Sequence, residues 1–181
     1  MSIQQSYDAL ATLLEYPYAK DGLIESCAQV TNYLDEKGLP VPVHPFQEMV
    51  QSSTLAELQE QYVANFDFNP AVAPYLGHHL YGDNQKKASY MITVKQEFKE
   101  FDFAPSSVEL PDHVGVVLSF LAHLARRGED AVRQKFIREL VLPGLEKFVA
   151  ACAPSAVSPW LTLIEAARLL CNADCQEVST C

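Results

Sequence analysis

Hydrophobic residues recur at helical spacing along almost the whole chain, whereas the period-two alternation of a β-strand is nearly absent. The first stripe joins Ile3, Tyr7, Leu10 and Leu14 on one helix face, and Pro17 ends it because a proline disfavours the helical region for the preceding residue. The pattern predicts an all-α fold, a single-domain multi-helix bundle. Its helices are expected at about residues 3–15, 21–37, 54–67, 74–81, 85–101, 111–127 and 129–152, with a last one from 159.

Prolines and cap residues refine these helix ends. Thr54 and Glu57 have the spacing of a capping box, and Ser158 followed by Pro159 is typical of a helix start. Pro143 predicts a kink or restart inside the segment 129–152.

Two glycines and one proline-rich segment mark further boundaries. Gly38 and Gly128 follow helical segments at positions that favour a left-handed cap. The segment 39–46, "LPVPVHPF", holds prolines at 40, 42 and 45 and is expected to be an extended connector.

Length and charge narrow the class of protein. A chain of 181 residues that is 49% hydrophobic can form one domain with a substantial core, expected over residues 1–171, followed by a short polar tail at 172–181. The formal net charge of -10 opposes binding to nucleic acid and to anionic lipid headgroups. Cationic partners, such as a basic peptide, are favoured instead.

The cysteines and the apolar runs indicate a cytoplasmic protein. Five cysteines, odd in number and scattered, suit free thiols in a reducing compartment better than a disulfide framework. The N-terminal stretch lacks the features of a secretory signal, and no apolar run is long enough to enter a membrane as a spanning helix.

Motifs for enzymatic chemistry are missing from the sequence. It contains no phosphate-binding glycine loop, no G-x-S-x-G nucleophile turn and no Glu-x-x-His pair for a carboxylate-bridged metal site. His113 and His123 lie too far apart on one helix to share an ion, and Cys171 with Cys175 would need two more ligands. We therefore expect no catalytic residue, no metal and no cofactor.

The segment "ELPDHVGVVLSFLAHL" at residues 109–124 opens an apolar helix. If the helix starts at Pro111, helical phase places Asp112 on the outer face and His113 on its shoulder. Taken alone, this is typical of a well-capped helix start. Similarly, Tyr62 and Phe66 are more typical of a core than of a ligand site.

Several segments in one order give a more specific indication. "LLEYP" near the N-terminus, "LQEQYVANFDFNPAVAPYLGHHLYGDNQKKASYM" and "ELPDHVGVVLSFLAHL" together resemble the NarJ branch of the TorD/DmsD/NarJ chaperones for molybdenum oxidoreductases. The resemblance covers about residues 5–127 and lies in the order and spacing of the segments, since each is weak alone.

The resemblance implies a cytoplasmic all-helical protein that is not an enzyme. Such a chaperone binds the N-terminal segment, in some relatives a twin-arginine segment, of a molybdopterin-dependent catalytic subunit such as nitrate reductase. It holds the apoenzyme until the cofactor is inserted. By motif match, the residues expected to bind the partner are Tyr75, Leu76, His79, Leu80, Gly82, Asp83, Glu109, Pro111, Asp112 and His113.

The sequence leaves two other functions open. An accessory subunit that remains in an oxidoreductase complex would also look like an acidic helical bundle, and a metal-dependent hydrolase is a further alternative. The chain is expected to be a monomer or a domain-swapped dimer with a hinge near residues 102–108.

Overall fold

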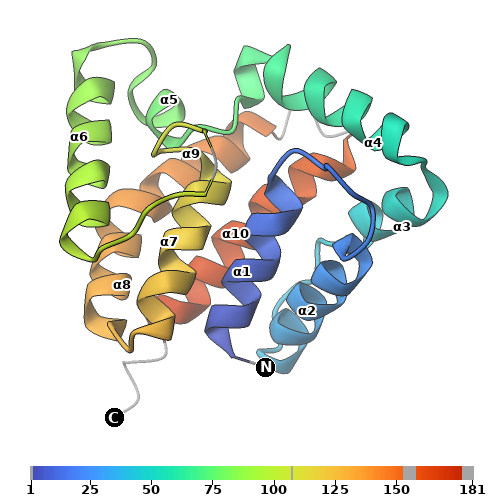
Figure 1. Ribbon diagram of the computed structural model, residues 1–181, viewed down its shortest axis with the longest axis horizontal. Coiled ribbons are helices and arrows are strands. Elements are labelled where there is room, and N and C mark those ends of the chain that lie inside the picture. Colours follow the sequence, from blue (N-terminus) through green and yellow to red (C-terminus); the bar gives the residue numbers. More distant parts are fainter. Residues whose placement is uncertain (1, 107, 153–157, 177–181) are drawn as a thin grey trace.

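The regular structure of the protein is helical (Figure 1). The computed structural model describes residues 2–106, 108–152 and 158–176. This part of the chain holds no strand and a single isolated β-bridge, so the prediction of an all-α fold is confirmed. The helices are α1 (Ile3–Leu14), α2 (Leu23–Glu36), α3 (His44–Ser52), α4 (Leu55–Tyr62), α5 (Leu76–Tyr81), α6 (Gln85–Glu100), α7 (Val114–Arg126), α8 (Asp130–Phe136), α9 (Leu142–Cys152) and α10 (Pro159–Gln176).

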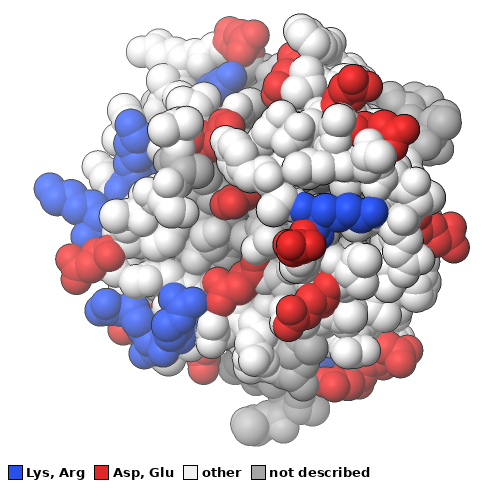
Figure 2. All heavy atoms as spheres, turned by 45° about the vertical axis from the view of Figure 1, so that its right-hand side comes forward, with Lys and Arg blue, Asp and Glu red and all other residues white. Residues whose placement is uncertain are grey.

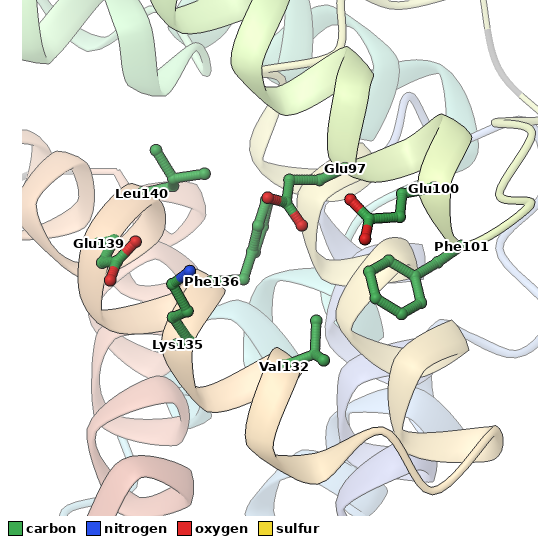
Figure 3. Close-up of a pocket in the computed structure, with 8 residues that line it drawn as sticks. All are labelled: Glu97, Glu100, Phe101, Val132, Lys135, Phe136, Glu139 and Leu140. Atoms are coloured by element: carbon green, nitrogen blue, oxygen red, sulfur yellow. The ribbon is translucent and has the colours of Figure 1, made fainter.

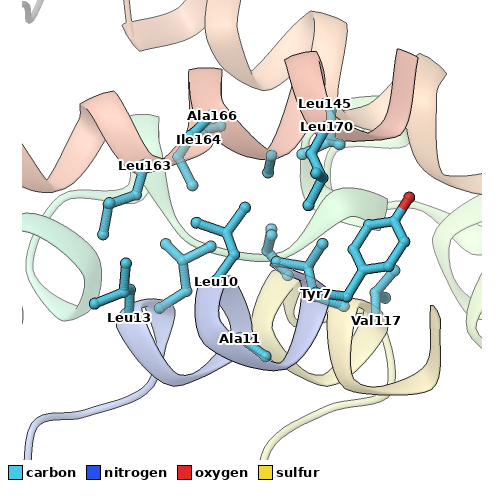
Figure 4. Close-up of a cluster of buried hydrophobic side chains, with 14 of the residues drawn as sticks. Tyr7, Leu10, Ala11, Leu13, Val117, Leu145, Leu163, Ile164, Ala166 and Leu170 are labelled. Carbon is cyan, nitrogen blue, oxygen red and sulfur yellow. The ribbon is translucent and has the colours of Figure 1, made fainter. Parts of the chain in front are cut away.

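The first helix lies at the centre of the bundle. α1 packs against α7 on one side and α2 on the other, and α10 crosses behind it (Figure 1). Its predicted apolar stripe is buried, with Tyr7, Leu10 and Leu14 fully enclosed. Figure 4 shows Tyr7 and Leu10 of α1 facing side chains of α10 and α7, among them Leu163, Ile164, Leu170 and Val117. Removal of this apolar area from water is the main stabilising contribution to the fold.

A second packing centre surrounds Trp160 at the start of α10. The indole is fully buried, and the rings of Phe46, Tyr62 and Phe66 lie edge-on to it at centroid distances of 4.7, 5.2 and 5.9 Å. These contacts join α10 to α3 and to the end of α4. The expectation that Tyr62 and Phe66 belong to the core is confirmed.

A buried ion pair fixes the end of α10. The guanidinium of Arg133 on α8 donates to both carboxylate oxygens of Asp174, at 2.7 and 2.8 Å, and the Tyr7 hydroxyl of α1 donates to the same carboxylate at 2.8 Å. Both side chains of the ion pair are almost completely buried. α10 therefore extends to Gln176, beyond the boundary at 171 expected for the polar tail, and residues 177–181 of that tail lie outside the described residues.

The prediction of a proline-rich connector at 39–46 is confirmed for residues 39–43, which lie outside any helix, and is wrong for residues 44–46. These last residues form the first turn of α3, which begins at His44 and places Pro45 in its first positions. A proline is tolerated there because its missing N–H would have no helical acceptor. The burial of Phe46 and Val50 against the core stabilises this helix, and that packing is invisible in the local proline pattern.

Several predicted helix ends are confirmed. Thr54 and Glu57 form the capping box, and both Gly38 and Gly128 have positive φ after their helices. The expected kink before Pro143 is a π-helical turn at Ile137–Val141 between α8 and α9. Such a turn accommodates the proline, which can neither donate to the preceding turn nor fit against its carbonyl groups. Four of the cysteines are described, and all four are free thiols, as expected.

The acidic excess lies on the surface. Acidic side chains are spread over the face seen in Figure 2, whereas basic side chains gather mainly toward one side of it. Among the described residues, no helix is both long and apolar enough to cross a membrane.

Candidate functional site

The two segments that carry the family resemblance meet at a short antiparallel bridge. Tyr75 pairs with His113, the Leu76 N–H donates to the Asp112 carbonyl at 2.9 Å, and the Val114 N–H donates to the Pro74 carbonyl at 2.9 Å. The bridge thus joins the starts of α5 and α7. It brings together predicted site residues that are far apart in the sequence.

Asp112 lies inside the protein and not on the outer face that helical phase predicted. α7 begins at Val114, three residues later than expected, so residues 111–113 do not follow helical phase. The Asp112 side chain is fully buried and its Oδ2 accepts a hydrogen bond from the Gly77 N–H at 3.0 Å. Burial raises the pKa of this carboxyl group, and the hydrogen bond from Gly77 partly opposes the rise.

The contact between Asp112 and α5 requires a glycine at position 77. A Cβ atom there would lie 2.7 Å from Asp112 Oδ2 and 3.0 Å from the Tyr90 ring.

We expect Gly77→Ala to reduce the free energy of unfolding by about 1–3 kcal/mol, because a buried contact would be overpacked. Urea denaturation followed by circular dichroism measures this loss. Gly82→Ala at the end of α5 is a poor control because Gly82 has positive φ. Ala88→Gly, at an exposed position of α6, is preferable, with an expected cost of about 1 kcal/mol. An unchanged stability in Gly77→Ala would contradict this packing.

His113 is the cap of α7 and is also buried, not placed on the helix shoulder. Its Nδ1 accepts a hydrogen bond from the Gly115 N–H at 3.1 Å, and only 1% of the residue is exposed. Burial lowers the pKa of the imidazole to about 4, so the ring is neutral at pH 7. Because Nδ1 accepts, the ring proton is on Nε2.

The Nε2–H of His113 has no acceptor among the described residues. A buried donor without a partner costs about 1–3 kcal/mol. Asp112 Oδ1 and Trp160 Nε1 are other buried polar atoms without a partner in the described part of the chain. The sequence pattern gave no indication of the unpaired His113 donor, since it depends on how the ring is turned.

A pocket of about 270 Å³ lies next to His113. Its wall combines the end of α1 and the loop after it, the end of α4 and the segment before α7. The rings of Tyr16 and Tyr18 lie 5.0 Å apart, and Tyr62 lies 5.5 Å from Tyr16. The lining residues, here called the tyrosine pocket, are Glu15, Tyr16, Tyr18, Tyr62, Ser106, Val108, Glu109 and His113.

The tyrosine pocket is electrostatically negative. Burial raises the pKa of Glu15, and the nearby charge of Glu109 raises it further. Glu109 accepts a hydrogen bond from the Tyr75 hydroxyl at 2.8 Å, which holds its carboxylate at the pocket edge. No lysine or arginine is among the described residues that line the pocket, so a cation there would be attracted by both carboxylates.

Two of the predicted site residues on α5 pack this helix against the rest of the bundle. Leu76 is fully buried, and the His79 ring stacks on Phe148 of α9 at 4.0 Å. His79 Nε2 donates to the Ala73 carbonyl at 2.8 Å, and burial lowers the pKa of this histidine to about 4. These side chains attach α5 to α9, where Leu76 is enclosed and His79 is partly buried.

The remaining predicted residues lie at the end of α5 and before α7. Gly82 ends α5 with positive φ, and the exposed Asp83 forms an ion pair with Lys87 at 3.2 Å. Leu80 is partly buried and Pro111 is buried. Asp83 and Glu109 are therefore the carboxylates of the predicted set that a partner can reach directly.

A second acidic cleft lies between α6 and α8 (Figure 3). Glu97, Glu100 and Glu139 line it with Lys135. Burial and the charge of Glu100 raise the pKa of Glu97, and Lys135 partly opposes the rise. This cleft of about 170 Å³ thus contains its own counter-charge. None of the sequence-predicted site residues lies in it.

Comparison with known proteins assigns the family. The sequence profile described as nitrate reductase delta subunit matches residues 23–164, which include both bridge segments and the pocket residues from Tyr62 onward. The chain belongs to the nitrate reductase delta subunit family. This agrees with the resemblance found in the sequence.

Two proteins named as nitrate reductase assembly chaperones are similar to the chain over different lengths. It is 24% identical over 141 residues to a probable nitrate reductase molybdenum cofactor assembly chaperone NarJ of Bacillus subtilis (strain 168), covering 76% of this chain and 77% of that protein. It is 26% identical over 120 residues to the nitrate reductase molybdenum cofactor assembly chaperone NarJ of Escherichia coli (strain K12), covering 64% of this chain and half of that protein.

A solved structure shares the fold. The crystal structure of a putative redox enzyme maturation protein from Archaeoglobus fulgidus aligns with a TM-score of 0.62 over 93% of each chain, at 17% identity. This member of the delta subunit family therefore shares its helical fold with that protein.

Sequence reasoning missed most of the tyrosine pocket in this family member. Glu15, Tyr16, Tyr18 and Val108 were not among the predicted site residues, although Glu15 and Tyr16 belong to the segment "LLEYP" that contributed to the resemblance. Tyr62 was assigned to the core alone. Its ring packs on Trp160 in the core and also lines the pocket.

Proposed function

We propose that this chain is an assembly chaperone for a molybdenum-dependent oxidoreductase, nitrate reductase or a relative. The observation that supports this proposal most directly is the family match over residues 23–164, which includes both segments that the bridge joins. The relatives named as nitrate reductase molybdenum cofactor assembly chaperones support the same role. The chaperone acts in the cytoplasm and is not an enzyme.

In this role the protein binds the N-terminal segment of the catalytic subunit. Exposed apolar side chains beside the bridge support the proposal, since Tyr18 is 83% exposed, Val108 fully exposed and Leu110 46% exposed. An apolar segment of the client that covers these side chains removes them from water. The exposed carboxylate of Glu109, between Val108 and Leu110 in the sequence, favours a segment with basic residues.

The buried predicted residues support the surface from below. Asp112 and His113 fix the starts of α5 and α7 through the Gly77 and Gly115 N–H groups. In this role both side chains act on structure, because they fix the position of the bridge. Their substitution is expected to weaken client binding through the position of the bridge.

Co-expression tests the proposed function. The catalytic subunit of a molybdenum oxidoreductase from the same organism is produced with and without this chain, and the molybdenum content of the purified subunit is measured. We expect the subunit to carry molybdenum only when the chain is present, and the mature active enzyme to be free of the chain. Equal molybdenum content in both cases would contradict the chaperone role, and stoichiometric retention in the active enzyme would favour an accessory subunit.

A further inference from the structure

We propose that the tyrosine pocket binds one basic residue of the client segment, at two points. The cationic side chain lies between Glu15 and Glu109 against the tyrosine rings, and the main-chain carbonyl oxygen of the bound segment accepts a hydrogen bond from His113 Nε2–H. This inference rests on the proposed function and names a binding subsite for it.

The donor of His113 is the first argument for a ligand. The side chain is almost fully buried, lines the pocket and has its other ring nitrogen occupied by the Gly115 N–H. Its Nε2–H has no acceptor in the described protein. A buried donor of fixed tautomer selects an acceptor, and a peptide carbonyl oxygen is the acceptor that every residue of a bound segment carries.

The two carboxylates are the second argument. Glu15 and Glu109 are close enough for the charge of one to raise the pKa of the other, and no basic side chain is among the described residues lining the pocket. A bound cation would interact favourably with both carboxylates and relieve their mutual repulsion. The cleft between α6 and α8 differs in this respect, because Lys135 lies among its glutamates.

The aromatic wall fits the same side chain. Tyr16, Tyr18 and Tyr62 form a series of edge-to-face ring contacts along the pocket. The faces of such rings attract an ammonium or guanidinium group, while their carbon atoms cover the aliphatic stem of a lysine or arginine. An acidic client side chain would be repelled by both carboxylates.

Calorimetric titration of the full chain with a synthetic peptide of the catalytic subunit's N-terminal segment tests the subsite. We expect the double variant E15Q/E109Q to bind about tenfold more weakly than the wild type, because both attractive charges are lost. His113→Asn is expected to weaken binding by about fivefold, since asparagine can cap α7 but carries no donor at the Nε2 position. Glu97→Gln with Glu100→Gln removes the same charge from the other cleft and should change the affinity by less than about twofold.

Peptide variants then identify the basic residue. Each lysine or arginine of the peptide is replaced in turn by norleucine, and one replacement is expected to abolish the effect of E15Q/E109Q. The Nε2–H resonance of His113, observed by NMR in the labelled wild-type chain, is expected to shift when the peptide binds. The resonance test needs no variant, so it holds even where His113→Asn affects folding.

The outcomes separate the subsite from the chaperone role. Tight binding of the peptide with no change in E15Q/E109Q, or with no shift of the His113 resonance, overturns the subsite and leaves the proposed function standing. A peptide that does not bind to the wild-type chain overturns both the subsite and the recognition of an N-terminal segment.

Discussion

Asp174→Ala is expected to reduce the free energy of unfolding by about 3–5 kcal/mol, because it leaves a buried guanidinium without its bidentate partner. Arg133 is 4% exposed at its side chain and would keep only Asp130, which is 66% exposed. The Tyr7 hydroxyl would lose its acceptor as well. Urea denaturation at pH 7, followed by circular dichroism at the helix band, measures the change.

Two control variants identify the cause of this loss. Asp8→Ala breaks the exposed ion pair with Arg126 and is expected to cost at most about 1 kcal/mol. The double variant Arg133→Met with Asp174→Leu removes both charges and should recover most of the stability. If the double variant is as unstable as Asp174→Ala, the unpaired charge is not the reason for the loss.

Trp160→Ala should destabilise the protein by about 3–5 kcal/mol, since it removes the ring on which three other aromatic residues pack. The indole is fully buried and joins α10 to Phe46 of α3 and to Tyr62, whose ring also lines the tyrosine pocket. A lowered melting temperature is expected together with weaker peptide binding, because Tyr62 loses its support. Thermal denaturation by circular dichroism and calorimetric titration measure the two effects.

Phe68→Ala is the matched control for this substitution. Phe68 is 81% exposed, so its loss is expected to change stability by less than about 0.5 kcal/mol. The single tryptophan also reports on the wild type, whose buried indole should show a blue-shifted fluorescence maximum that moves to longer wavelength on unfolding. A wild-type spectrum typical of an exposed indole would contradict the packing of Trp160.

The sequence predicts the fold well where helical periodicity and caps agree. The stripe of α1, the capping box at Thr54 and the interruption before Pro143 all depend on residues within one or two turns of each other. α3 was missed because its stability comes from Phe46 packing on the distant Trp160, and no local pattern carries that contact.

The candidate site shows the same difference between features set by neighbouring residues and features set by contacts between distant segments. Motif order correctly grouped the segments around Tyr75 and His113, which the bridge places side by side. The orientation of single side chains could not be predicted, because Asp112 follows the backbone of the bridge and not the phase of α7. Burial and tautomer of His113 depend on contacts between segments that are distant in sequence.

The bridge also closes a long loop of the chain. Its hydrogen bonds from the Leu76 and Val114 N–H groups hold together the two ends of this loop, which contains α5 and α6. Within the loop, α6 lies at the edge of the bundle (Figure 1), and its buried residues are Tyr90, Val94 and Phe98. The entropy of closing a loop grows slowly with its length. Changes of length between α5 and α6 can therefore accumulate during evolution while the starts of α5 and α7, and the pocket beside them, keep their geometry.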